Sequence, residues 1–211
     1  MLYDGIMFDL DGTLWDCTET SAKVWNELVK KYYPDISDEI TAEVLKQQFG
    51  KPLREIGIAL FQSVSSERAV DVVNDLCRKQ GEYIAKMGGT LYPELESTLK
   101  ELSEHCKLFI ISNCEDGYIE SFFEAHGLGE YFTDYECPGR SGLLKADNIK
   151  LIVNRNGLKN PVYVGDTALD AQSAKEAGVP FIFASYGYGT VEEYVGKLTT
   201  ISDLVKLLDE D

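Results

Sequence analysis

The sequence contains little histidine and a clear shortage of basic residues. Among 211 residues there are 2 His, and 20 Lys and Arg stand against 36 Asp and Glu, a net charge of -16. Proteins that bind nucleic acid usually carry a basic patch, so we expect no nucleic-acid partner. An acidic protein can still bind a phosphate where a metal and one or two local bases reverse the field in a pocket.

The sequence also lacks features of secreted and membrane proteins. Its 5 cysteines are odd in number and show no C-x-x-C spacing, so we expect reduced thiols in a cytoplasmic protein. Acids at Asp4 and Asp9 interrupt the N-terminal segment, so we expect no signal peptide. No apolar run approaches the ~20 residues of a membrane span, so we expect no membrane partner.

The chain shows two patterns that meet near residue 90. Residues 3–8 form an apolar run typical of a buried strand, and residues 17–87 show helical spacing with no convincing strand. Beyond residue 92, predicted helices alternate with predicted strands. The predicted helices cover residues 94–105, 116–126, 145–156, 168–177 and 201–208, and the predicted strands cover residues 107–111, 132–135, 161–164 and 181–184.

This alternation predicts a parallel sheet with helices on both faces. We therefore predict an α/β fold with a Rossmann-like core domain of residues 1–15 and 90–211. Residues 16–89 are predicted to form an all-helical cap domain, inserted after the first strand. The cap begins directly after a polar segment at residues 9–13, so it could close over a site in that segment like a lid.

That segment, the first polar motif, places two carboxylates, Asp9 and Asp11, at the end of the first predicted strand, followed by Gly12 and Thr13. Alternate side chains of a strand share one face, so both acids can start on the same side. Gly12 permits a sharp turn out of the strand. Because paired acids are costly without a cation, the motif predicts a metal site that also carries a nucleophile.

Polar residues also follow the later predicted strands. Ser112 and Asn113 follow one strand, Asp166 follows another, and Asp170 stands about one helical turn beyond Asp166. Lys145 lies where a loop is predicted to enter a helix. Ligands of open α/β sheets bind beyond the carboxyl ends of the strands, so we expect these residues to converge there.

In order and spacing, these residues resemble the four motifs of the haloacid dehalogenase-like superfamily, within its phosphoglycolate phosphatase-like group with a helical cap. The first motif, D-x-D-G-T, matches residues 9–13, and the fourth, G-D-x-x-x-D, matches residues 165–170. The Ser or Thr of the second motif matches Ser112, and the Lys of the third matches Lys145. The resemblance spans nearly all of the chain, and the first and fourth motifs are specific in combination.

The resemblance implies a Mg²⁺-dependent phosphatase that hydrolyses a small-molecule phosphate monoester through an aspartyl-phosphate. Asp9 would be the nucleophile, Asp11 the acid and base, and Lys145 the group that offsets negative charge and orients Asp9. Asp11 would then need a raised pKa to hold a proton at neutral pH. The implied phosphate-binding residues are Ser112, Asn113, Gly12 and Thr13, and the implied metal-binding residues are Asp9, Asp11 through its backbone carbonyl, Asp166 and Asp170, the last supporting the metal's surroundings.

Some of these residues also fit simpler interpretations. Ser112 and Asn113 can form an ordinary helix-capping turn. Lys145 can be a solvated lysine, and Asp170 a surface acid. For these residues, a functional role is favoured only because the first and fourth motifs occur in the same chain.

Residues 50–54 resemble the loop with which capped relatives sense their substrates. Lys51 or Arg54 could pair with an anionic tail of the substrate, and a solvated loop charge is an equally open interpretation. Residues 186–189, with sequence Tyr-Gly-Tyr-Gly, could line the pocket or simply pack as a loop.

Three alternative functions stay open. A sugar phosphomutase of the β-phosphoglucomutase type shares both aspartates, although its usual hinge histidine is absent from residues 16–33. A dehalogenase or phosphonate-cleaving relative lacks the acid found here at Asp11. A non-catalytic metal-binding module would keep the site without turnover. The sequence determines neither the physiological ester, nor a choice between monomer and dimer, nor any redox sensitivity of Cys114.

Overall fold

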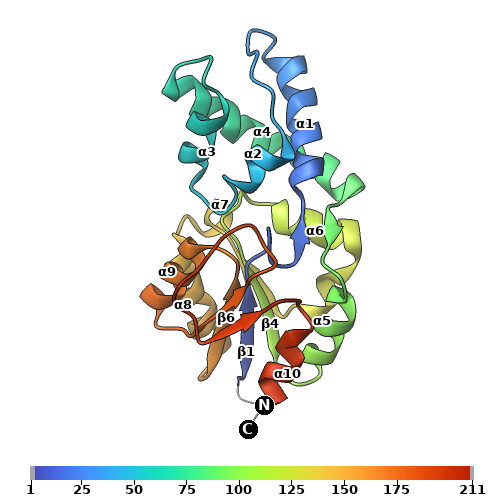
Figure 1. Cartoon of the computed structure of the whole chain (residues 1–211), viewed down its shortest axis with the longest axis vertical. Helices are drawn as coiled ribbons and strands as arrows, with labels where there is room; N and C mark the ends of the chain where they lie inside the picture. The colour runs from blue at the N-terminus through green and yellow to red at the C-terminus, as the bar shows by residue number, and fades with distance from the viewer. Residues whose placement is uncertain (1–2, 210–211) are drawn as a thin grey trace.

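The computed structural model describes residues 3–209, in which six parallel strands form one sheet. The strand order is β5-β4-β1-β6-β7-β8, so the first strand of the chain lies inside the sheet. Figure 1 shows the sheet in the lower half of the molecule with helices on both sides. The strands are β1 (Gly5–Phe8), β4 (Lys107–Ile111), β5 (Asp134–Glu136), β6 (Pro161–Gly165), β7 (Phe181–Ala184) and β8 (Gly196–Leu198).

Successive side chains of each central strand enter two different apolar clusters. Ile6 and Phe8 of β1 pack on one face with helices α5 (Leu95–Ser103), α6 (Tyr118–His126) and α10 (Asp203–Asp209). Met7 packs on the other face with α8 (Lys145–Asn156) and α9 (Ala168–Ala177). Burial on both faces explains why the parallel strands are continuous apolar runs in the sequence.

Four helices form the cap above the carboxyl ends of the strands (Figure 1). They have an apolar cluster of their own, which includes Trp25, Leu45 and Leu76. Apolar residues recur on one stripe of each long helix, and burial of that stripe against its neighbours stabilises the cap. The helices are α1 (Thr18–Tyr32), α2 (Ala42–Lys46), α3 (Leu53–Leu60) and α4 (Ser66–Met87).

A short antiparallel ribbon joins the cap to the core. It pairs β2 (Trp15–Asp16) with β3 (Thr90–Leu91), and Asp16 stands opposite Thr90. The chain therefore enters and leaves the cap side by side. Gly88 ends α4 with a φ of 67°, a conformation that favours glycine, just before the ribbon.

The structure confirms the predicted α/β fold with a parallel sheet and an inserted helical cap. The division into domains at residues 16 and 89 stays a prediction. Strand β8, the ribbon and two short helices, α7 (Pro138–Ser141) and the 3₁₀ helix η1 (Leu128–Tyr131), were not predicted. In the described chain, no helix combines the length and apolarity that would let it span a membrane.

Candidate active site

The sheet register brings three polar loops together. Phe8 of β1 pairs with Ile110 of β4 on one side and with Val164 of β6 on the other. The loops that begin at Asp9, Ser112 and Asp166 therefore leave the sheet at neighbouring positions. The strands β4 and β6 flank β1 on opposite sides, so the direction in which strands are added reverses there. Open α/β sheets form their ligand-binding crevice at such a point.

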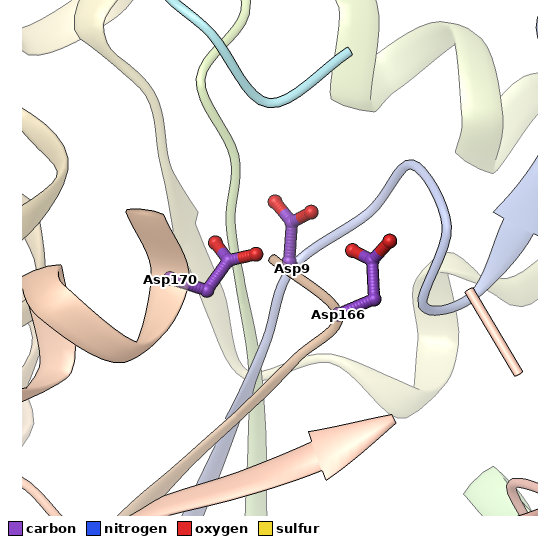
Figure 2. Close-up of side chains that lie close together, drawn as sticks. All are labelled: Asp9, Asp166 and Asp170. Carbon is purple, nitrogen blue, oxygen red and sulfur yellow. The ribbon is translucent and has the colours of Figure 1, made fainter. Parts of the chain in front are cut away.

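Three carboxylates meet in this crevice. Asp9, Asp166 and Asp170 are buried, and one oxygen of each lies within 4.8 Å of the others. Figure 2 shows the carboxyl group of Asp9 between the other two. Negative charges held so close and away from water repel one another strongly unless cations offset them.

Lys145 supplies part of that positive charge. It is the first residue of α8, and its ammonium group donates to Asp9 Oδ1 at 2.7 Å and to Asp170 Oδ1 at 2.6 Å. Its side chain is 3% exposed, so the interpretation as a solvated lysine is wrong. Burial alone lowers the pKa of Lys145, but the carboxylates of Asp170 and Asp9 outweigh burial and hold the pKa well above its ordinary value.

Asp170 positions Lys145 and caps a helix at the same time. Its Oδ2 accepts from the Thr167 backbone N–H at 3.0 Å and from the Thr167 hydroxyl at 2.5 Å, a capping box at the start of α9. Because Oδ1 accepts from Lys145, both oxygens already have donors. Asp170 is buried, so the interpretation as a surface acid is wrong. Its contact with Lys145 orients the lysine toward Asp9.

Asp9 and Asp166 keep oxygens that could bind a cation. Lys145 contacts Oδ1 of Asp9, and the backbone N–H of Tyr188 donates to Oδ2 of Asp166 at 2.7 Å. Burial and the nearby carboxylates of Asp170 and Asp9 raise the pKa of Asp166 well above its ordinary value. Burial likewise raises the pKa of Asp9 to about 6, against the opposing effect of Lys145. Hard carboxylate oxygens with excess negative charge fit Mg²⁺.

Asp11 lies apart from the three carboxylates and has its own donors. Its Oδ1 accepts from the indole of Trp15 at 3.0 Å and from the hydroxyl of Tyr118 at 3.0 Å. Burial, followed by the charge of Asp9, raises the pKa of Asp11 to about 7, although both hydrogen bonds oppose that shift. The carboxyl group can therefore hold a proton near neutral pH, as the predicted acid must.

The turn after Asp11 packs tightly against Asp166. Gly12 has a φ of 84°, and a Cβ on it would lie 2.3 Å from Asp166 Oδ2, so a larger residue does not fit. The hydroxyl of Thr13 is buried and points at Asp166 Oδ1 from 3.5 Å. Both residues therefore support Asp166, whereas their predicted contact with phosphate stays a prediction.

The cap touches the core at the second motif. Ser112 is buried directly after β4, and the Asn113 side chain donates to the backbone carbonyl of Gly50 at 3.2 Å. Lys51 lines a cavity of about 500 Å³ between cap and core, together with Asn113 and Lys145. The structure thus brings Ser112, Asn113 and Lys51 to the site.

Arg54 does not join them. It is exposed on α3, and neither cavity beside the site includes it. The residue of α3 that lines both cavities is Leu53. A role for Arg54 toward substrate therefore has no geometric support.

Several site residues were missed by sequence reasoning. Trp15 and Tyr118 both hold Asp11. Trp15 lies four positions from Asp11, but Tyr118 lies 107 positions away, and no local pattern reveals that contact. For Tyr188, the sequence allowed either a pocket-lining role or simple loop packing. Its backbone N–H donates to Asp166, and its hydroxyl donates to Asp16 at 3.0 Å. The alternation of Tyr and Gly in residues 186–189 was the available signal.

The parallel sheet thus carries clustered carboxylates and a buried lysine at its strand ends, beneath a helical cap. The family model of the haloacid dehalogenase-like hydrolases matches residues 6–184. The chain belongs to this family, and the expectation of a family enzyme is confirmed.

Known proteins resemble the chain over nearly its full length. A phosphoglycolate phosphatase of Aquifex aeolicus is 28% identical over 216 residues, covering 97% of this chain and 96% of the relative. One of Rhodobacter capsulatus is 28% identical over 200 residues, covering 87% and 84%. A solved structure from Haemophilus somnus, described as a predicted phosphoglycolate phosphatase, has a TM-score of 0.83 with 19% identity and covers 99% of both chains. The resemblance to the phosphoglycolate phosphatase-like group is thereby confirmed.

Proposed function

We propose that the protein is a Mg²⁺-dependent phosphatase that hydrolyses a small-molecule phosphate monoester through an aspartyl-phosphate on Asp9. The observation that carries the proposal is the buried Lys145 between Asp9 and Asp170, with Asp166 beside them. The phosphatase names of the relatives support the same reaction class.

Asp9 is suited to attack phosphorus. Lys145 holds one oxygen of its carboxylate and so restricts the orientation of the other. A fixed nucleophile avoids much of the entropic cost of reaching the reactive geometry. The attack forms the bond between Asp9 and phosphorus as the bond from phosphorus to the leaving oxygen breaks.

Asp11 is suited to move the proton. Its carboxyl group, held by Trp15 and Tyr118, would donate a proton to the leaving alkoxide. The resulting carboxylate would then accept a proton from the water that hydrolyses the aspartyl-phosphate. One residue therefore serves both half-reactions.

Asp9, Asp166 and the backbone carbonyl of Asp11 would hold the magnesium ion. When bound, the ion supplies charge stabilisation to the phosphoryl oxygens. Ser112 and the backbone after it would grip the same oxygens. The cap, which reaches the core at Gly50 and Asn113, would exclude bulk water and large substrates.

The test is phosphate release from a panel of metabolite phosphates by the full chain with Mg²⁺. We expect release to stop with a chelator and in Asp9→Asn. Asp71→Asn, an exposed change on α4, is the matched control and should keep full activity. No release from any ester by the folded, Mg²⁺-loaded protein would contradict the proposal, and isomerisation of a sugar phosphate without net release would favour the mutase alternative.

A further inference from the structure

Two cavities meet beneath the cap. The outer one, about 500 Å³, opens between cap and core beside Lys51 and Lys145. The smaller one, about 40 Å³, is lined by Asp11, and we name it the inner cavity because it lies at that residue. Both are lined by Leu53, Asn113, Cys114 and Glu115, so the inner cavity continues the outer one.

Under the proposed function, the leaving group belongs in the inner cavity. A general acid must come within hydrogen-bond reach of the oxygen that it protonates. Asp11 lines the inner cavity, whereas Lys145 lines the outer one. The cavity is larger than one water molecule requires but leaves room for only a short group.

The inner cavity offers no positive charge. Its described lining includes two acids, Asp11 and Glu115, and no Lys, Arg or His. Much of the remaining wall is apolar, from side chains such as Trp25, Phe49 and Ile56. An anionic leaving group would lose part of its hydration there without gaining an ionic partner from the lining, which is costly.

Nearby cations of the cap are engaged elsewhere. Lys46 forms an ion pair with Asp16 at 2.9 Å. Lys51 donates to the side-chain oxygen of Gln48 at 3.1 Å and faces the outer cavity. Arg54 is exposed, outside both cavities. Arg78 and Lys79 form ion pairs with Asp75. None of these side chains lines the inner cavity.

Two amides in the inner cavity supply one donor and one acceptor. Because the indole of Trp25 can only donate, its 2.6 Å contact makes the Gln80 oxygen the acceptor and leaves the Gln80 amino group as a donor. Because the Gly50 carbonyl can only accept, its contact makes the Asn113 nitrogen the donor and leaves the Asn113 oxygen as an acceptor. A hydroxyl group can donate and accept, so it complements this pair.

We propose that the preferred substrate is a phosphate monoester of a short, uncharged, hydroxyl-bearing alcohol, recognised by Gln80 and Asn113. A carboxylate on the leaving group, as in phosphoglycolate, is disfavoured because acidic and apolar side chains line the inner cavity. This inference rests on the proposed function and adds the class of leaving group to it.

Four esters that share a two-carbon leaving group test the proposal: 2-hydroxyethyl phosphate, phosphoglycolate, phosphoethanolamine and ethyl phosphate. With the full chain and saturating Mg²⁺, we expect kcat/KM for 2-hydroxyethyl phosphate to exceed each of the other three by about tenfold or more. Equal or better turnover of phosphoglycolate, of phosphoethanolamine or of ethyl phosphate would overturn the proposal.

A second measurement assigns the recognition to Gln80. Gln80→Glu keeps an oxygen for Trp25 but replaces the donor with an acceptor, so the ratio of 2-hydroxyethyl phosphate to phosphoethanolamine should fall by about tenfold. Gln62→Glu adds the same charge at an exposed cap position and should leave the ratio unchanged. An unchanged ratio in a Gln80→Glu protein with a native-like thermal transition would overturn the assignment.

The outcome separates this inference from the proposed function. If the broad metabolite panel shows Mg²⁺-dependent release that requires Asp9 but none of the four esters is hydrolysed, the leaving-group proposal is wrong and the phosphatase proposal stands. If no ester of any kind is hydrolysed, the phosphatase proposal itself fails.

Discussion

The hydroxyl of Tyr118 and the indole of Trp15 both donate to one oxygen of Asp11, a residue that lines the inner cavity. Two fixed donors restrict the rotation of the carboxyl group. This arrangement separates Asp11 from Asp9, although only one residue lies between them in the sequence. Lys145 contacts Asp9, whereas indole and phenol groups contact Asp11.

We expect Asp11→Asn to keep the fold and Mg²⁺ binding while losing turnover. The amide has the shape of the carboxyl group but cannot give a proton to the leaving group, so kcat should fall by ~10²–10⁴-fold. Steady-state phosphate release measures the loss, and the shift in thermal unfolding caused by Mg²⁺ measures binding. Full turnover would refute the assignment of acid and base to Asp11.

At single positions, the motifs named residues that the structure brings together, while the predicted roles of these residues stay predictions. Asp9, Lys145, Asp166 and Asp170 converge because each lies at a strand end or the start of a helix in a parallel sheet. Sequence reasoning could not identify residues whose role comes from packing between distant helices. Gln80 reaches the inner cavity from the cap, and nothing in its local sequence distinguishes it from other helical glutamines.

The loop after β7 is the element that supports Asp166 in the carboxylate cluster. Tyr186 donates to the Thr13 carbonyl at 2.9 Å, and Tyr188 donates its backbone N–H to Asp166. Between them, a Cβ on Gly187 would lie 2.3 Å from the Cβ of Asp166 and 2.4 Å from the Gly12 carbonyl oxygen. The loop approaches the site this closely because residue 187 has no side chain.

We therefore expect Gly187→Ala to destabilise the protein by about 1–3 kcal/mol and to weaken Mg²⁺ binding. The matched control is Gly81→Ala on α4, where a Cβ would meet Ser121 Oγ at an ordinary 3.6 Å. That change should be neutral or stabilise the protein by up to ~1 kcal/mol. Urea denaturation and Mg²⁺ titration of both variants provide the measurements, and equal effects of the two would contradict the packing argument.

The loop between α2 and α3 gives a second test at this scale. Lys51 faces the outer cavity, where its charge would attract the phosphate dianion of any ester, so Lys51→Ala should raise KM several-fold with little change in kcat. Arg54→Ala removes the same charge from an exposed position outside both cavities and should leave KM nearly unchanged. A larger KM effect from Arg54→Ala would show that the cap closes differently on substrate.

For the whole molecule, the crowded carboxylates predict an unusual dependence of stability on pH. The pKa of Asp9 is raised to about 6 and that of Asp11 to about 7, whereas an unfolded chain has a value near 3.9. Between about pH 4 and pH 7 the folded state thus binds more protons than the unfolded state. The unfolding free energy of the metal-free protein should therefore fall as pH rises, by roughly a few kcal/mol.

Mg²⁺ should reverse most of this loss, because a cation stabilises the ionised carboxylates and binds only the folded site. We expect Mg²⁺ to raise the thermal midpoint more near pH 8 than near pH 5. In Asp9→Asn the pH-dependent loss should shrink, and the response to Mg²⁺ should be weaker. A metal-free protein that gains stability steadily from pH 5 to pH 8 would contradict the placement of these acids.

The architecture of the whole molecule was largely predictable because alternating strands and helices leave few topologies open. The elements that were not predicted are short. Strands β2 and β3 have two residues each and pair across 74 positions, and β8 has three residues at the edge of the sheet. Such segments owe their conformation to a distant partner rather than to their own apolar pattern.

The β2–β3 ribbon has a consequence for how such proteins diversify. Since Asp16 stands opposite Thr90, the two ends left by removing the inserted helices already lie next to each other. A tight turn or an entirely different module can span that junction without disturbing the strands that bear the carboxylates. Evolution can therefore exchange what selects the molecule to be cleaved while retaining the machinery that cleaves it.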